Sequence, residues 1–162
     1  MKRVITTVVP LGAIVLLVLA VSAWAAPTTK RHTGGDHHGQ GKTITVIEHA
    51  TTDTTTDTGA QGDSVGDILT FANEVYDADD KNKVGSDQGI CFRTLVGKAW
   101  ECFWTLSLDK GQITVEGPFL DAGDSVLAIT GGTGDFAGAM GDMALKARGT
   151  DGKAYDFIYR IK

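Results

Sequence analysis

Two polar side chains interrupt apolar strand faces in this sequence and are candidates for chemistry. Because side chains alternate along a strand, the run "ITVIE" puts Glu48 on the same face as Ile44 and Val46, and "FANEV" puts Asn73 on the face of Phe71. An unpaired buried polar group costs roughly 1 to 3 kcal/mol, so each side chain needs a partner or a task. Glu48 either acts on a ligand, with a pKa raised by desolvation, or reaches water at a strand end. Asn73 either contacts a ligand or bonds the backbone of the wall.

The two cysteines are the next candidates. In "CFRTLVGKAWEC" a tight turn centred on Val96 and Gly97 would place Cys91 directly opposite Cys102, and opposed residues face the same side of a sheet. In an oxidising compartment we expect a disulfide, worth up to about 3 kcal/mol for so short a loop. The alternative is a free Cys91 thiol available for nucleophilic or proton-transfer chemistry.

A glycine-rich run, "AITGGTGDFAGAMG", has the G-x-G-x-x-A spacing of a dinucleotide-binding turn at Gly132, Gly134 and Ala137. That motif needs a helix directly after it and an acidic residue about 20 residues further on. Instead, "DMALKAR" alternates like a strand, and "TDG" at residues 150–152 turns into another strand. We therefore expect a glycine-rich corner between two antiparallel strands, and we expect no cofactor.

About eight strand-like runs position these residues, and no convincing helical run occurs from Lys42 onward. Short links such as "DKG" at 109–111 and "TDG" at 150–152 make neighbouring strands antiparallel. The pattern predicts one all-β domain over residues 42–162, either a small barrel or a sandwich. The expected strands span residues 43–50, 67–76, 89–95, 99–108, 112–117, 125–130, 142–148 and 154–161.

The N-terminus predicts export. Lys2 and Arg3 precede an apolar stretch, residues 4–21, and "AWA" at 23–25 supplies the small residues of a cleavage site, so residues 1–25 are expected to be a signal peptide of a secreted protein. The alternative is an uncleaved anchor, but two threonines and a proline shorten the run below the roughly 20 residues that span a bilayer. Cleavage removes two cations and no anions, which takes the formal charge from −5 to −7 and disfavours nucleic acid as a partner.

Two polar stretches lack periodicity. Residues 26–41, "APTTKRHTGGDHHGQG", are expected to be a flexible linker. Its His32, His37 and His38 suggest metal binding, but no cysteine or carboxylate framework surrounds them, so a solvated linker is favoured and no metal site is predicted. Residues 51–64, "TTDTTTDTGAQGDS", are expected to be a loop, either mobile or O-glycosylated.

Three ordered motifs resemble the allene oxide cyclase family: "GDILTFANEVYDADDKNKVGSDQGIC", "GQITVEGPFL" and "LAITGGTGDFAGAMGD". The last is also similar to the glycine-rich corner of plant dirigent proteins, which share the barrel superfamily. The resemblance covers residues 66–162. It implies an eight-stranded antiparallel, calycin-type barrel, commonly a homotrimer, whose lumen receives a small hydrophobic ligand and whose glycine corner is structural.

The resemblance also implies roles for individual residues. The family's lumen uses a first-strand glutamate, an asparagine two residues beyond it, a second asparagine in F-x-N-x-x-Y-D, a cysteine in G-I-C and a tyrosine in G-P-Y-L. Glu48, Asn73 and Cys91 stand at three of these positions, whereas Ala50 replaces the first-strand asparagine and Phe119 the tyrosine. The residues implied are Glu48 and Asn73 as catalytic groups, and Phe71, Cys91 and Phe119 as ligand-binding groups.

Three functions remain open at this point. The favoured one is an isomerase or cyclase of a fatty-acid-like or polyketide-like oxygenated compound, in which Glu48 and Asn73 direct charge at one oxygen. Without the first-strand asparagine, part of the oxyanion support is missing, which favours a ligand other than an allene oxide. The second is a secreted dirigent-like or carrier protein that binds an apolar ligand without converting it. The third is an extracellular interaction module whose barrel is filled by its own side chains.

Overall fold

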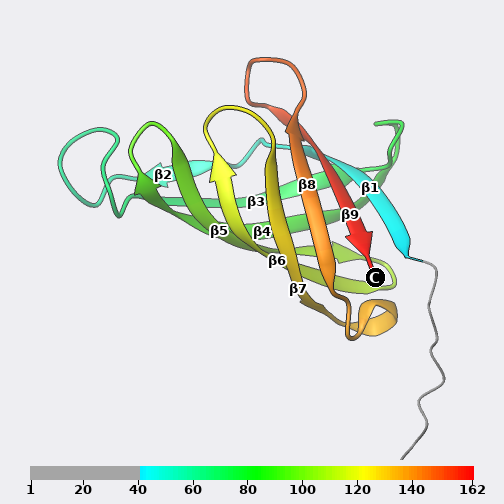
Figure 1. Cartoon of the computed structure of the whole chain (residues 1–162). Coiled ribbons are helices and arrows are strands. Elements are labelled where there is room, and N and C mark those ends of the chain that lie inside the picture. Colours follow the sequence, from blue (N-terminus) through cyan, green and yellow to red (C-terminus); the bar gives the residue numbers. More distant parts are fainter. Residues whose placement is uncertain (1–40) are drawn as a thin grey trace, which may run out of the picture. The chain divides into compact units, whose positions relative to one another are not determined.

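The computed structural model describes residues 41–162, which form a closed eight-stranded antiparallel β-barrel with one extra strand (Figure 1). The predicted signal peptide and the three linker histidines lie outside these residues. No helix within residues 41–162 is long and apolar enough to cross a membrane. The elements are β1 (Lys42–His49), β2 (Thr54–Thr56), β3 (Ile68–Tyr76), β4 (Lys83–Leu95), β5 (Ala99–Leu108), β6 (Gly111–Leu120), β7 (Ser125–Gly132), the 3-10 helix η1 (Gly134–Phe136), β8 (Gly141–Ala147) and β9 (Ala154–Ile161).

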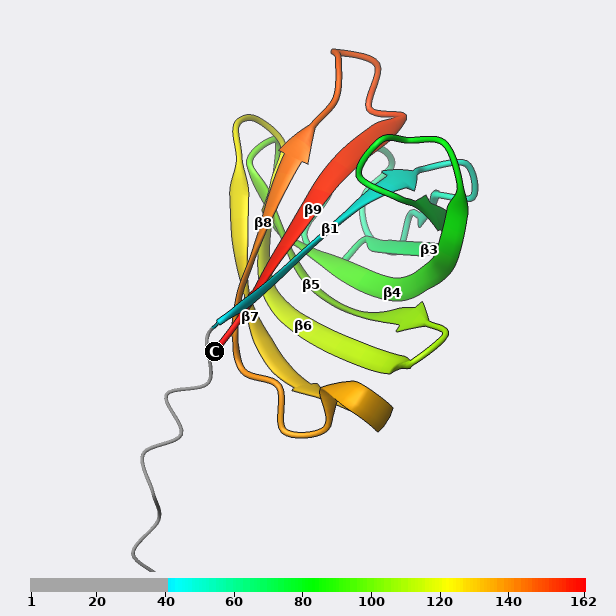
Figure 2. The same ribbon diagram turned by 90° about the vertical axis from the view of Figure 1, so that its right-hand side faces the viewer.

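Closure of the sheet depends on β1. Strands β3 to β9 pair antiparallel in sequence order, and β1 pairs along its whole length with β9. The last three residues of β1 also pair with the end of β3, for example Glu48 with Val75, and this contact closes the barrel. Figure 2 shows β1 beside β9, with β3 and β4 on its other side. Closure pairs β1 with β3, the two end strands of the eight-stranded sheet, and makes the fold a barrel rather than a sandwich.

The core consists of the inward faces of the strands. Along β5 the side chains of Trp100, Cys102, Trp104 and Leu106 are buried, and the intervening Glu101 is exposed. Glycine is required where two large side chains meet at the wall. A Cβ atom on Gly89 would lie 2.3 Å from Cβ of Trp104 and 2.8 Å from Cζ of Phe71. The glycine therefore leaves room for the aromatic side chains that line the barrel.

The eight predicted runs correspond to the eight barrel strands, with two differences in the strands themselves. Strand β4 begins at Lys83 rather than at residue 89. The sequence pattern missed the first part of this strand because two of its inward positions are glycines, Gly85 and Gly89, which show no apolar side chain in the alternation. Strands β6 and β7 are also longer than expected. The glycine-rich corner does join antiparallel strands, β7 and β8.

Two loop predictions need correction. Residues 51–64 are not simply a loop, because they contain β2, which pairs with Ile68–Thr70 of β3. All three threonines of β2 are exposed, so the strand has no apolar face that a sequence pattern would reveal. Residues 150–152 do not form a tight turn, since Arg148 N–H donates to the Ala154 carbonyl across a longer loop.

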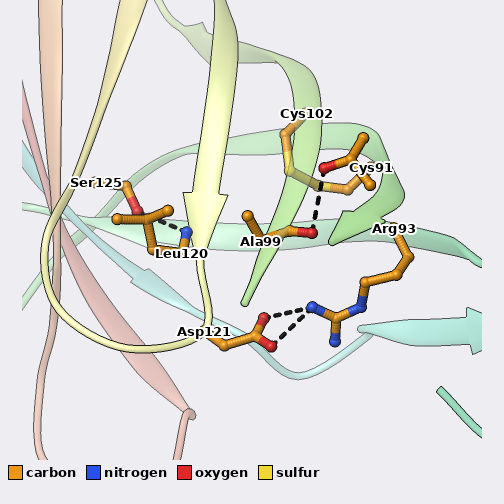
Figure 3. The surroundings of a disulfide bond; sticks show 8 residues. Cys91, Arg93, Ala99, Cys102, Leu120, Asp121 and Ser125 are labelled. Carbon is orange, nitrogen blue, oxygen red and sulfur yellow. Dashed lines mark hydrogen bonds and ion pairs between the residues drawn. A yellow bond between two sulfur atoms is a disulfide. The ribbon is translucent and has the colours of Figure 1, made fainter. Parts of the chain in front are cut away.

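The predicted disulfide is confirmed and the free-thiol alternative for Cys91 is wrong. Cys91 and Cys102 are opposed in the β4–β5 register, their Cα atoms are 4.0 Å apart, and they form a disulfide (Figure 3). The turn differs from the expected one. A bulge between Arg93 and Leu95 leaves a three-residue loop, in which Gly97 has a φ of 64°. The cysteines stay opposed because the extra residue of the bulge, Thr94, offsets the extra residue of the loop.

The buried side chain of Arg93 binds two loops beside the disulfide. The guanidinium of Arg93 donates to both carboxylate oxygens of Asp121 at 2.7 Å (Figure 3), and its Nε lies 2.6 Å from Asp63 in an ion pair that is not aligned as a hydrogen bond. The guanidinium also stacks on Trp100, 4.0 Å from the ring centroid. These contacts tie the segment after β2 and the β6–β7 loop to the barrel.

Removal of the disulfide is expected to destabilise the barrel moderately. The bridge closes a sequence separation of 11 residues, so the double substitution Cys91→Ala and Cys102→Ala should lower the free energy of unfolding by about 2 to 3 kcal/mol. Urea unfolding of the oxidised parent and the double variant measures this difference. Equal unfolding midpoints would contradict the prediction.

Candidate functional site

A pocket lies in the barrel, toward the end where β1 stops and β9 begins; its empty space is about 340 Å³ when the open solvent at its mouth is included, and its enclosed part is small, about 30 Å³. Asp53, which lines it, is exposed, so the cavity reaches the surface at this end. Most of its wall is apolar. The lining residues are Glu48, Asp53, Leu69, Phe71, Cys91, Cys102, Trp104, Phe119, Leu145, Tyr155 and Phe157.

Five of the eleven side chains in this wall are aromatic. Trp104 is at the centre: its ring centroid lies 5.4 Å from Phe157 and 5.9 Å from Phe71. Phe119 and Tyr155 contact each other edge to face, with centroids 6.0 Å apart. Such a wall offers ring faces and edges to a flat or cyclic apolar ligand.

The side chain of Asn73 joins two carboxyl groups to the backbone. Its Nδ2 donates to Oε1 of Glu48 at 2.8 Å and to Oδ1 of Asp53 at 2.7 Å. Its Oδ1 accepts from the backbone N–H groups of Thr51 and Thr52, both at 3.0 Å. Both donors and both acceptor lone pairs of the amide are thereby used. The predicted backbone partner of Asn73 is therefore present, together with a direct contact to Glu48.

The same amide compensates for a break in the sheet. Strands β1 and β2 both pair with β3, but their registers differ by one residue: Glu48 is opposite Val75, whereas Thr54 is opposite Thr70. The segment between the two strands loses its ladder hydrogen bonds. Asn73 lies opposite this gap and satisfies backbone groups that would otherwise be unpaired.

Glu48 is a buried carboxyl in the polar corner of the cavity. Its residue is 5% exposed, so it does not reach bulk water, and the expected inward orientation is found. Burial raises the pKa of Glu48 to about 7, the hydrogen bond from Asn73 opposes this rise, and the nearby Asp53 adds to it. The carboxyl therefore exchanges a proton near neutral pH, as a general acid or base must.

Sequence reasoning missed a second buried carboxyl, Asp87. It lies on β4 directly opposite Asn73, is 1% exposed, and its two carboxyl oxygens have no hydrogen-bond partner among the described residues. Burial, and then the nearby Glu48, raises the pKa of Asp87 well above its usual range. Alternation along the β4 face of Gly89 and Cys91 could have identified it, had the strand been extended to Lys83.

Tyr155 is a second omission. It is opposite Glu48 in the β1–β9 register and lines the cavity beside Phe119. Burial, followed by the negative charges of Glu48 and Asp53, raises the pKa of Tyr155, so its hydroxyl stays protonated as a donor. Sequence alternation on β9 could have placed its side chain inside the barrel.

The predicted site residues are found together. Phe71, Cys91 and Phe119 all lie in the cavity wall, Cys91 as half of the disulfide. Ala50 lies just beyond β1, where its N–H donates to the Lys153 carbonyl. Within residues 41–162, no group of three or more His, Cys, Asp or Glu side chains is placed to hold a metal ion.

Comparisons with known proteins agree with this architecture. The model of the allene oxide cyclase family matches residues 46–157. A solved pyocyanin demethylase is 27% identical, with a TM-score of 0.62 over 73% of this chain and 100% of that chain.

Two further solved structures are similar in fold. The pterocarpan synthase dirigent protein PsPTS1 is 15% identical, with a TM-score of 0.62 over 76% of this chain and 94% of that chain. The exo-specific intermolecular Diels–Alderase AbnU is 16% identical, with a TM-score of 0.55 over 76% of this chain and 98% of that chain. The same barrel thus occurs in enzymes and in dirigent proteins.

Proposed function

This chain belongs to the allene oxide cyclase family, and from that premise we propose that its barrel binds a small hydrophobic, oxygen-containing compound and rearranges it by proton transfer at Glu48. The observation that carries the proposal is a buried carboxyl with a raised pKa in the wall of a largely apolar cavity. Confinement of a flexible compound near its reactive conformation supplies much of the acceleration of a cyclisation. The protein then needs few reacting groups of its own.

The proposed step is a cyclase-type isomerisation, which needs no oxidant or reductant. Glu48 takes a proton from one atom of the substrate, and the electron pair of the broken bond stays in the substrate. Glu48 then returns the proton to a different atom. A pKa of about 7 suits both directions near neutral pH, because neither form of the carboxyl is scarce.

The two neighbours of Glu48 have different roles in this proposal. Tyr155 lines the cavity, and we propose that its hydroxyl donates a hydrogen bond to the ligand's oxygen; Phe119 has no hydroxyl with which to do so. Asn73 has both of its N–H groups on carboxyl oxygens, so it holds Glu48 in place rather than contacting the ligand. Charge that develops on the ligand's oxygen is then stabilised by one preorganised donor.

The charges of the cavity narrow the class of ligand. Among the described residues that line it, two are carboxylic acids, Glu48 and Asp53, and none is Lys, Arg or His. A ligand with a free carboxylate would meet repulsion there without a compensating cation. We therefore favour an uncharged or cationic ring compound over a fatty-acid anion. The 27% identity to a pyocyanin demethylase supports a ring-containing ligand.

A binding protein without turnover is the second candidate. The same fold occurs in a dirigent protein, and the saturated hydrogen bonds of Asn73 leave fewer groups free to act on a ligand. Assays that detect bound ligand and rearranged product separately distinguish the two functions.

We also propose that the protein works outside the cytoplasm, which the Cys91–Cys102 disulfide supports. A homo-oligomer remains part of the proposal. Phe92 and Phe103, 39% and 49% exposed, pair their rings on the outer face of β4 and β5, where a second copy of the chain would cover them.

Filling the cavity is expected to weaken binding at least 10-fold while the barrel still folds. The substitution Leu69→Trp places a larger ring in the cavity wall, so the affinity for 1-naphthol and pyocyanin should fall at least 10-fold by isothermal titration calorimetry. Val126→Trp, at a 56% exposed position on the outer face of β7, is the matched control and should bind like the parent. Sodium laurate tests the charge argument.

Two outcomes would contradict the proposal. Unchanged binding of both ring compounds by Leu69→Trp would place the site elsewhere. Laurate binding as tight as that of 1-naphthol would overturn the preference for an uncharged or cationic ligand.

A further inference from the structure

Three buried polar side chains in the barrel have no hydrogen-bond partner among the described residues: the Asp87 carboxyl, Trp104 Nε1 and the Tyr159 hydroxyl. Asp87 is the one that ionises most readily. An isolated carboxylate removed from water is costly unless it is paired or hydrogen-bonded. The ionisation state of Asp87 therefore depends on what surrounds it.

Within residues 41–162, the surroundings of Asp87 supply no positive charge. On β3, Asn73 donates both of its side-chain N–H groups to Glu48 and Asp53, so neither is free for Asp87. The backbone N–H of Asn73 points toward Asp87 and partly opposes the rise in its pKa, but it is not aligned as a hydrogen bond. On β5 the opposed residue is the apolar Leu106.

The remaining titratable groups near Asp87 are acids or phenols. Glu48 on β1 and Asp53 act on Asp87 as like charges, and Glu48 is also close enough to share a side-chain hydrogen bond with Asp87 once one of the two carboxyls is protonated. On β9, burial raises the pKa of Tyr159, and the charges of Asp87 and Glu48 raise it further, so this phenol is neutral too. None of the described groups that face Asp87 carries a positive charge that would stabilise its ionised form.

We propose that Asp87 is a positioning residue that carries a proton at neutral pH and shares it with Glu48, so that the two carboxyls act as one acid–base unit. This inference rests on the proposed function of Glu48. Glu48 lines the cavity and Asp87 does not, so only Glu48 meets the ligand. Two carboxyls in one desolvated site cannot both ionise readily, and their protons leave in two coupled steps.

The unit explains how Glu48 can act as a base inside an apolar cavity. When Glu48 is ionised, the proton held by Asp87 stabilises the single negative charge of the pair. When Glu48 takes a proton from the substrate, Asp87 keeps its own, and the pair becomes neutral until Glu48 returns the proton. No proton leaves the site during this cycle, and the electron pair of the broken bond stays in the substrate.

The test needs no substrate. Selective ¹³C labelling of aspartate and glutamate side-chain carboxyls allows NMR to follow the titration of each group. In the parent we expect one aspartate signal to be protonated at pH 7 and to be absent in Asp87→Asn, and we expect Glu48 to titrate in two steps that become one in that variant. Asp67→Asn is the matched control, because Asp67 accepts backbone hydrogen bonds from Thr58 and Ser64 and its pKa is lowered.

The outcomes separate the inference from the proposed function. An Asp87 carboxylate at pH 7 in the parent, or an unchanged titration of Glu48 in Asp87→Asn, would overturn the inference. If Asp87→Asn does not fold, Glu48→Gln replaces it, and the titration of Asp87 should then move to lower pH. For any converted substrate, Asp87→Asn should shift the pH profile of kcat more than KM. Proton sharing without turnover of any compound would refute the proposed function and leave the inference intact.

Discussion

Glu48→Gln is expected to lower kcat by roughly 10²- to 10⁴-fold for any compound that the parent converts, because it removes the group that accepts and returns the proton. The change is nearly isosteric, and the glutamine carbonyl can still accept the hydrogen bond from Asn73 Nδ2. The barrel should therefore fold and keep its cavity. Glu116→Gln, at an exposed position on β6, is the matched control and should retain parental activity. Product analysis by chromatography and mass spectrometry measures both variants.

The same variant has a defined effect on stability. Burial raises the pKa of Glu48 from 4.5 to about 7, so the folded state binds its proton more tightly than the unfolded chain does. The contribution of Glu48 to stability is therefore fully present below pH 4.5 and is lost as the pH rises through about 7. Relative to the parent, Glu48→Gln should gain stability across this interval in urea unfolding.

Either of two results would contradict these expectations. Parental kcat in Glu48→Gln would remove Glu48 from the chemistry and assign the proton transfer to another group. A stability difference that does not vary with pH between 4.5 and 7 would mean that Glu48 titrates in its ordinary range.

Asn73→Ala is expected to have the largest effect on stability. It leaves two backbone N–H groups and two carboxyls without their partner. The buried Glu48 carboxyl loses its partner at a cost of about 1 to 3 kcal/mol, and the bonds to the exposed Thr51, Thr52 and Asp53 add a smaller amount, so a loss of about 3 kcal/mol in the free energy of unfolding is expected. Urea unfolding at neutral pH measures the loss. Thr70→Ala, at an exposed position on the same strand, should change stability far less.

A second substitution at this position separates structure from catalysis. Asn73→Asp adds a carboxyl beside Glu48 and Asp53, so it should be destabilising at neutral pH and should recover in part when acid protonates the cluster. If Asn73→Ala were as stable as the parent but inactive, the amide would act on the ligand directly and its positioning role would be wrong.

Several features of the site could be predicted from the sequence because they depend on local periodicity. Alternation placed Glu48 and Asn73 on inward faces, and both are buried. The symmetry of the β4–β5 hairpin placed Cys91 opposite Cys102 even though the turn contains a bulge. The resemblance to the allene oxide cyclase family, carried by three motifs, is confirmed by the family match over residues 46–157.

The arrangement of the polar groups required the tertiary structure. β1 meets β3 only because seven intervening strand pairings bring the sheet round to itself, and no local pattern encodes that contact. It is this closure that puts Glu48 within 2.8 Å of Asn73. Asp53 contacts Asn73 from a segment whose sequence shows no periodic apolar residues. Strand β2, which is exposed on both faces, shows no such pattern either.

The sequence by itself thus determined which side chains face inward, because a strand has a period of two and the printed residues reveal it. It also determined which cysteines pair, because they belong to one hairpin. Only the tertiary structure decided which inward groups meet and which lack a partner. The saturation of Asn73 and the position of Asp87 beside Glu48 depend on contacts across the closed barrel, and the distances between strands far apart in sequence are set by closure and not by alternation.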